Sequence, residues 1–210
     1  MDALRSGPIA RHRLRPSEWG LAVLAVALMA AGHWWARDGE LPESERRCFD
    51  AVNGLPDGLR FGWWAPMQLG NALVCVLAPL LVLWRTRRLR PALATFVATL
   101  GGWLGAKAVK RVVPRGRPEY FLAEAVRFRE AAPTGLGFIS GHTAVAFGLA
   151  TVLRPHLPRR LRAGLFGLVV LTGTGRMYFG AHLPADVLAG AGFGFACGLT
   201  ANAVVGVDPR

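Results

Sequence analysis

The sequence predicts an all-α, polytopic membrane protein, and three observations lead to this fold class. Hydrophobic residues make up 52% of the 210 residues, and the mean hydropathy is +0.33. The apolar residues gather into six runs of about 20 residues each, which is the length that a helix needs to cross a bilayer. Short clusters of arginine separate these runs. We therefore expect residues 1–210 to form a single domain, a bundle of six membrane-spanning helices.

The six runs give the expected helices in chain order. Aromatic residues near their ends, among them Trp19, Trp34, Trp84, Tyr178 and Phe179, are expected at the membrane interface, which amphipathic rings prefer. Small residues are dense in the last run, so its backbone is expected to approach its neighbours closely. The expected helices cover Trp19–Ala36, Pro66–Trp84, Pro91–Val109, Phe138–Leu153, Arg162–Phe179 and Leu183–Val205.

Basic residues set the expected orientation of the bundle. Arginine clusters lie in residues 1–18, 85–90 and 154–162, which share one side when the six helices are threaded in order. Because positive residues accumulate on the cytoplasmic side of a membrane, we expect both termini in the cytoplasm and loops 37–65 and 110–138 outside, in the plasma membrane of a bacterial cell. The net charge of +12 does not indicate a nucleic-acid partner, since the basic residues sit in short clusters between apolar runs.

Loop 110–138 departs from this charge rule. It holds six basic residues against three glutamates, although the threading places it on the outer side. A surplus of positive charge there is unfavourable for topology, so we expect these side chains to serve another purpose. The three cysteines, by contrast, show no spacing typical of a disulfide framework or a zinc site, and we expect no metal and no cofactor.

One stretch combines three ionisable residues within an otherwise apolar and aromatic run: Arg176, His182 and Asp186. Such groups cost free energy at the edge of a membrane segment unless they are paired or used, so they indicate a functional site. Pro184 suits the first turn of a helix, which places His182 just before the helix and Asp186 about one turn later. The carboxylate then holds one imidazole nitrogen and leaves the other unprotonated, as a nucleophile or base requires.

Two further segments supply cations and a helix start. Lys110 and Arg117 lie in the basic loop, and Ser140 is expected to cap a helix over Gly141 and His142, leaving free backbone N–H groups at its start. The threading brings both segments to the same extracytoplasmic end as the start of the last helix. Two helix N-termini and three cations then meet at one place. This predicts an anion site, and phosphate is the anion that uses this many donors.

Together the three segments resemble the signature of the type-2 phosphatidic acid phosphatase superfamily, which includes lipid phosphate phosphatases and vanadium haloperoxidases. The resemblance covers roughly residues 110–190, and three spaced motifs in the right order make it specific. This chain departs from the pattern at Ile139, where the family usually has proline, and at Gly175, where it usually has serine. The motifs read Lys110-x6-Arg117-Pro118, Ser140-Gly141-His142 and Arg176-x5-His182-x3-Asp186.

The resemblance implies a function and a role for each residue. It implies an integral membrane lipid phosphatase in which His182 attacks phosphorus and forms a phosphohistidine, Asp186 orients His182, and His142 is the general acid and base. The substrate is expected to be phosphatidic acid, phosphatidylglycerol phosphate, a polyprenyl diphosphate or a lipid-linked sugar phosphate. No metal is implied. The implied phosphate-binding residues are Lys110, Arg117, Ser140, Gly141 and Arg176.

Other classes of function remain open from the residues alone. A membrane transporter, or a lipid-binding protein with a non-catalytic anion site, would also need intramembrane charges, although the chain shows no inverted repeat. An intramembrane serine protease built on Ser140 and His142 is disfavoured, because residues two apart on a helix do not face each other. Release of phosphate from a labelled lipid in the presence of EDTA separates these classes.

Overall fold

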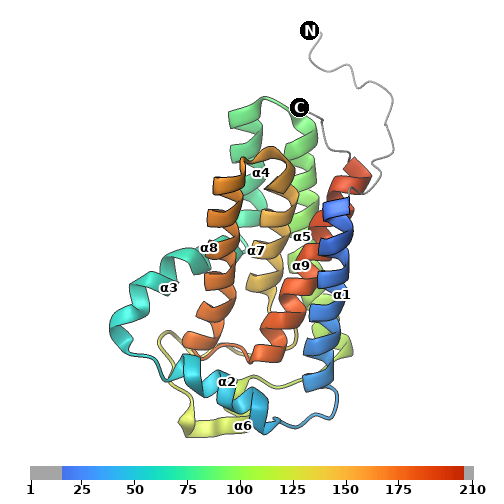
Figure 1. Cartoon of the computed structure of the whole chain (residues 1–210). Coiled ribbons are helices and arrows are strands. Elements are labelled where there is room, and N and C mark those ends of the chain that lie inside the picture. The colour runs from blue at the N-terminus through green and yellow to red at the C-terminus, as the bar shows by residue number, and fades with distance from the viewer. Residues whose placement is uncertain (1–15, 206–210) are drawn as a thin grey trace.

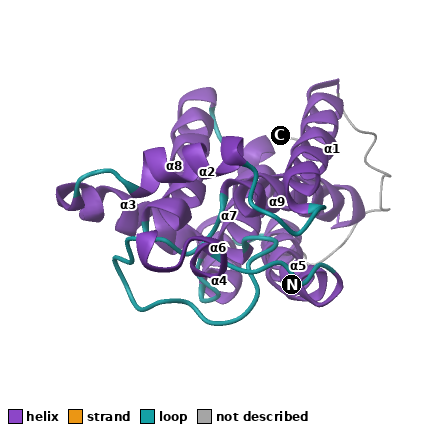
Figure 2. Ribbon diagram, turned by 90° about the horizontal axis from the view of Figure 1, so that it is seen from below, coloured by secondary structure: helices purple, strands orange, loops and turns teal. Residues whose placement is uncertain are grey.

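The computed structural model describes residues 16–205, and these residues form helices and no strand. Helices α1, α4, α5, α7, α8 and α9 run along a common direction, while α2 and α6 lie across one end of the bundle (Figure 1). Figure 2 looks onto this end, where loops cross between the helices. The helices are α1 (Pro16–Ala36), α2 (Glu43–Asn53), α3 (Arg60–Met67), α4 (Val74–Thr86), α5 (Leu89–Val112), α6 (Pro118–Leu122), α7 (Gly141–Leu153), α8 (Arg159–Tyr178) and α9 (Pro184–Val205).

Three helices of the described chain are long and apolar enough to cross a membrane: Glu18–Ala36 of α1, α5 and α9. The bent pair Asp57–Gly70 and Val74–Thr86 would make a fourth span if it is counted as one. Helix α7 has 13 residues, which is shorter than a bilayer crossing requires. The chain is therefore an all-helical integral membrane protein, and the count of six spanning helices stays a prediction.

The expected single helix over Pro66–Trp84 is wrong. Helix α3 ends at Met67, α4 begins only at Val74, and the two segments differ in direction by 76°. The Asn71 carboxamide oxygen accepts a hydrogen bond from the backbone N–H of Leu73 at 3.0 Å, a local turn that competes with continuing the helix. Gly70 lies just before this turn, and a Cβ on it would come within 2.4 Å of the His142 carbonyl oxygen. The bend therefore brings the chain against the start of α7.

Smaller differences concern the ends of helices. Helix α5 continues to Val112, so Lys110 lies in its last turn rather than in a loop, and α7 begins at Gly141 instead of Phe138. The two expected outer loops are not plain loops, because α2 and α3 lie within residues 37–65 and α6 lies within residues 110–138. The other expected helix ends lie within three residues of the observed ones. The basic tail expected over residues 1–18 falls almost wholly outside the described residues.

Helix α9 packs along α1, α5 and α7 and forms the centre of the bundle. A Cβ on Gly194 would lie 2.5 Å from the Ala144 carbonyl oxygen, and one on Gly192 would lie 2.5 Å from that of Ala25. Only glycine permits backbones to come this close. The close approach expected from the small residues of the last run is therefore confirmed.

Two of the five arginines in residues 110–138 form ion pairs with carboxylates of residues 37–65. Arg115 pairs with Glu45 at 2.6 Å, and Arg129 pairs with Asp57 at 2.7 Å. The Arg129 guanidinium also lies 4.0 Å over the ring of Tyr178 and donates to the Tyr178 carbonyl oxygen. These contacts cover the end of α8, so the expectation that Tyr178 and Phe179 face the membrane interface is wrong; both are fully buried.

A native cysteine can show on which side of the membrane this end of the bundle lies. Cys48 is exposed on α2, whereas Cys75 is buried. If residues 37–65 are extracytoplasmic, a membrane-impermeant maleimide should label Cys48 in intact cells. Partial desolvation of the thiol and the charge of Glu45 raise the pKa of Cys48, so labelling should be run at mildly alkaline pH.

Cys48→Ser should abolish this labelling, which identifies the thiol that reacts. Permeabilised cells give the maximum signal for comparison. Labelling that appears only after permeabilisation would place this end of the bundle in the cytoplasm.

Candidate active site

A cavity of about 280 Å³ opens at the end of the bundle where α5 ends and α7 and α9 begin. Six of the eight residues expected from the sequence line it: Lys110, Arg117, Gly141, His142, Arg176 and His182. The other two, Ser140 and Asp186, are fully buried next to it. The remaining lining residues come from the bend after α3 and from α5: Gly70, Asn71, Ala72, Trp103, Ala106 and Lys107.

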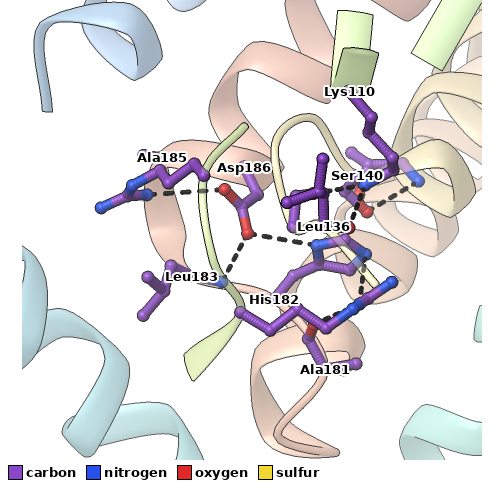
Figure 3. Close-up of polar contacts among 12 residues, drawn as sticks. Lys110, Leu136, Ser140, Ala181, His182, Leu183, Ala185 and Asp186 are labelled. Atoms are coloured by element: carbon purple, nitrogen blue, oxygen red, sulfur yellow. Dashed lines mark hydrogen bonds and ion pairs between the residues drawn. The ribbon is translucent and has the colours of Figure 1, made fainter. Parts of the chain in front are cut away.

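His182 is held by the start of α9. Its Nδ1 lies 3.2 Å from Oδ2 of Asp186, and the same oxygen accepts a hydrogen bond from the backbone N–H of Leu183 at 3.0 Å (Figure 3). Because Pro184 begins the helix, Asp186 follows one turn after His182 and its carboxylate reaches back to the ring. An ionised carboxylate only accepts, so Nδ1 carries the proton and the lone pair is on Nε2.

The surroundings keep this imidazole neutral. Burial, followed by the positive charges of Lys110, Arg176 and Arg117, holds the pKa of His182 well below its usual value. Nε2 lies 3.5 Å from Nη1 of Arg117, on the side where His182 lines the cavity. The ring thus presents an unprotonated nitrogen to a space surrounded by cations, which is the state that a nucleophile requires.

Two of the three cations, Lys110 and Arg117, are fixed by carbonyl oxygens rather than neutralised by carboxylates. Lys110 Nζ donates to the carbonyls of Leu136 and Gly137 at 2.8 and 2.6 Å. Arg117 Nη1 donates to the Ala181 carbonyl at 2.7 Å, and its Nε donates to the Gly135 carbonyl at 3.0 Å. These bonds set the direction of each side chain without cancelling its charge. The remaining N–H groups are left for an anion in the cavity.

Arg176 differs from the other two cations because it has a carboxylate partner. Its Nη1 lies 3.1 Å from Oε1 of Glu130 and 3.3 Å from the sulfur of Met67. Its Nε is buried and has no hydrogen-bond partner within the described residues. A buried donor without an acceptor is costly, so this N–H indicates a site for an anionic ligand.

The start of α7 is tied to the start of α9. Ser140 caps α7, its Oγ accepting from the backbone N–H of Thr143 at 3.4 Å and from Thr143 Oγ1 at 2.9 Å. The backbone N–H of Ser140 donates to the Asp186 carbonyl at 2.9 Å. Two helix N-termini therefore meet at the cavity, and His142 is the second residue of one of them.

The two departures from the family pattern have local explanations. A Cβ at Gly175 would lie 3.3 Å from Cδ1 of Trp63, so this position faces α3 rather than the cavity. A serine hydroxyl there would meet Trp63 instead of a phosphate. Ile139 is buried in an apolar cluster with Ala36, Ala106 and Ala185, where its side chain packs behind the cavity.

Two buried residues beside Asp186 were not singled out by the sequence. Arg115 Nη1 lies 3.5 Å from Oδ1 of Asp186, and Glu45 accepts from the backbone N–H of Ala185 at 2.9 Å. Arg115 stands two positions before Arg117, but sequence reasoning counted it only as a loop charge. Glu45 is one of six carboxylates in residues 37–65, and nothing in the local sequence distinguishes it from the others.

The donor set around the cavity suits an anion. Among residues 16–205, no group of three or more histidine, cysteine, aspartate or glutamate side chains is placed to hold a metal. The cavity instead brings together Lys110, Arg117 and Arg176 with two histidines. Positive charges and N–H donors of this kind stabilise negative charge on phosphate oxygens.

Comparisons with known proteins agree with the all-helical membrane fold. The family model described as the PAP2 superfamily matches residues 89–208. The fold is similar to that of LpxE from Aquifex aeolicus, with a TM-score of 0.64 and 29% identity over 74% of this chain and 92% of that one. It is also similar to the first transmembrane PAP2 type phosphatidylglycerolphosphate phosphatase from Bacillus subtilis, with a TM-score of 0.64 and 18% identity over 89% and 94%. Among curated proteins, none matches the chain.

The unpartnered Nε of Arg176 predicts that an oxyanion stabilises the protein. Vanadate should raise the melting temperature of the detergent-solubilised chain, because a ligand at about 100 times its Kd adds roughly 2.7 kcal/mol to the free energy of unfolding. Arg176→Met should remove most of this shift. The matched control is Arg111→Gln, since Arg111 is exposed and does not line the cavity. An equal shift in Arg176→Met and wild type would show that the oxyanion binds elsewhere.

Proposed function

Because the chain belongs to the PAP2 superfamily, we propose that it is a membrane lipid phosphatase that hydrolyses a phosphate monoester or diphosphate of a lipid through a phosphohistidine. One observation carries the proposal. The unprotonated Nε2 of His182 faces a cavity lined by Lys110, Arg117 and Arg176. A nucleophile without cations would have no means to hold a phosphate, and cations without a nucleophile would only bind one.

In the first step, Nε2 of His182 forms a bond to phosphorus while the bond from phosphorus to the leaving oxygen breaks. The Nδ1 proton stays on the ring, which becomes positively charged, and the Asp186 carboxylate stabilises that charge. The leaving oxygen takes the departing electron pair and a proton from His142. In the second step, His142 accepts a proton from water, whose oxygen forms a bond to phosphorus while the bond from phosphorus to Nε2 of His182 breaks. Phosphate leaves, and the electron pair returns to Nε2, so the ring is neutral again.

Negative charge builds on the non-bridging oxygens during both steps. Lys110, Arg117 and Arg176 stabilise this charge from fixed positions, together with the backbone N–H of Gly141 at the start of α7. The Ser140 hydroxyl oxygen is engaged as a helix cap, so its part in binding phosphate would come through its O–H. Because the cations neutralise the phosphate, the reaction needs no metal ion.

The substrate approaches from the membrane. The cavity wall includes the apolar Ala72, Trp103 and Ala106, and the ammonium of Lys107 lies 3.6 Å over the ring of Trp103. Aromatic and cationic residues of this kind sit where lipid headgroups meet the acyl chains. This supports phosphatidic acid, phosphatidylglycerol phosphate, a polyprenyl diphosphate or a lipid-linked sugar phosphate as the substrate. In this proposal six helices cross the plasma membrane, the termini are cytoplasmic, and the site faces outward.

The covalent step is tested by trapping the intermediate. Wild-type protein in EDTA should release phosphate from a radiolabelled lipid and, after rapid quenching, carry an acid-labile phosphoryl group. His182→Asn should lose both. Asp186→Asn should remain folded and turn over slowly, because it still accepts a hydrogen bond but lacks the charge.

A phosphoenzyme that persists in His182→Asn would assign the nucleophile to another residue. Wild-type protein that binds vanadate yet releases no phosphate from any lipid would identify a non-catalytic anion site.

The role of His142 is tested by the leaving group. An alkoxide leaving from a lipid monophosphate needs a proton, whereas nitrophenolate hardly does. General acid catalysis contributes on the order of 100- to 10,000-fold, so His142→Ala should lose about that much on the lipid and clearly less on nitrophenyl phosphate. Formation of the phosphoenzyme should be followed in a single turnover, because the later activation of water also depends on His142. Equal losses on the two substrates would leave His142 as a binding residue.

A further inference from the structure

Glu45, Arg115, Asp186 and His182 form a buried row of alternating charges behind the cavity. Arg115 binds Glu45 with both nitrogens of its fork, Nη2 to Oε2 at 2.6 Å and Nη1 to Oε1 at 3.1 Å. Its Nη1 also lies 3.5 Å from Oδ1 of Asp186, whose other oxygen faces His182 Nδ1 at 3.2 Å. The side chains of Glu45 and Asp186 are 0% exposed, and that of Arg115 is 2% exposed.

From this row we infer that Glu45 and Arg115 are positioning residues for the proposed nucleophile. Arg115 holds Asp186 in place, and Glu45 balances Arg115 so that Asp186 keeps its negative charge for His182. The inference rests on the proposed function. Neither residue lines the cavity, so both act through Asp186 and neither touches the substrate.

The geometry gives the first half of the argument. A carboxylate held only by His182 and the Leu183 N–H would accept through Oδ2 alone and could rotate about its own axis. Arg115 at Oδ1 fixes the second oxygen and with it the plane of the carboxylate. Glu45 in turn fixes Arg115 through a bidentate pair, which is a geometrically specific contact. The Glu45 carboxylate also accepts from the Ala185 N–H, so the row is anchored to the first turn of α9.

The net charge of the row gives the second half of the argument. With neutral His182, the row holds two carboxylates and one guanidinium and has a net charge of −1. Transfer of a phosphoryl group to Nε2 makes the ring cationic, and the row becomes neutral. If Glu45 were absent, Arg115 would already neutralise Asp186, and the same transfer would leave a buried net positive charge. Uncompensated buried charge is strongly unfavourable, so Glu45 favours the phosphorylated state.

Glu45→Gln tests the charge, because glutamine has nearly the same shape and its amide oxygen, in the place of Oε1, still accepts from the Ala185 N–H and from Arg115 Nη1. The bond from Arg115 Nη2 to Oε2 is lost with the charge. The rate of phosphoenzyme formation and kcat should fall by at least about 10-fold while KM stays near the wild-type value, since the cavity is unchanged. The matched control is Glu43→Gln on the same helix, where the Glu43 side chain is 62% exposed and pairs with Arg47. It should behave as wild type.

The double variant Glu45→Gln/Arg115→Gln separates charge from simple structural support. It restores the net charge of −1, so its phosphorylation rate should exceed that of Glu45→Gln alone, a non-additive result. If the pair only supports the fold, the double variant should be no faster than the single one. That outcome, an unchanged kcat in Glu45→Gln, or failure of Glu45→Gln to fold would each overturn the inference. Wild-type protein without lipid phosphatase activity would instead refute the proposed function.

Discussion

The hydrogen bond between His182 Nδ1 and Asp186 Oδ2 is the interaction around which this end of the molecule is built. It requires a carboxylate without any exposure to solvent at the first turn of a central helix, and such a group needs partners on every side. The Leu183 N–H supplies one and Arg115 supplies another. Residues 37–65 and 110–138 both contribute to this shell, which explains why segments expected as outer loops fold closely over the bundle.

The packing of the apolar helices determines where the polar residues of the site lie. Glycines along α9 let it approach α1 and α7 closely, which sets the distance between the two helix starts at the cavity. The bend before α4 carries Gly70 against the backbone of His142, so this bend also holds the second histidine. The positions of the site residues therefore depend on the close packing of the helices as well as on the ion pairs.

Much of this arrangement could be predicted from the sequence, and the exceptions share a cause. Helices α8 and α9 were placed to within three residues because long apolar runs between charged residues leave little choice. His182 and Asp186 are four residues apart, so their contact could be predicted from the sequence. The bend after α3 was missed because Pro66–Trp84 is apolar apart from Gln68 and Asn71, while the turn depends on one hydrogen bond of Asn71. Glu45 was missed because its partner Arg115 lies 70 positions away and both looked like surface charges.

The order in which the site is assembled also follows from the fold. Glu45 is made early, and Arg115 and His142 come in the middle of the chain. His182 comes just before the last helix of the described chain, and Asp186 lies in its first turn. A nascent chain that has not yet reached α9 carries the cations of the cavity without the carboxylate that holds His182. The proposed activity would therefore begin only when the last helix of the described chain is in place, and a partly synthesised chain in the membrane would not consume the lipid.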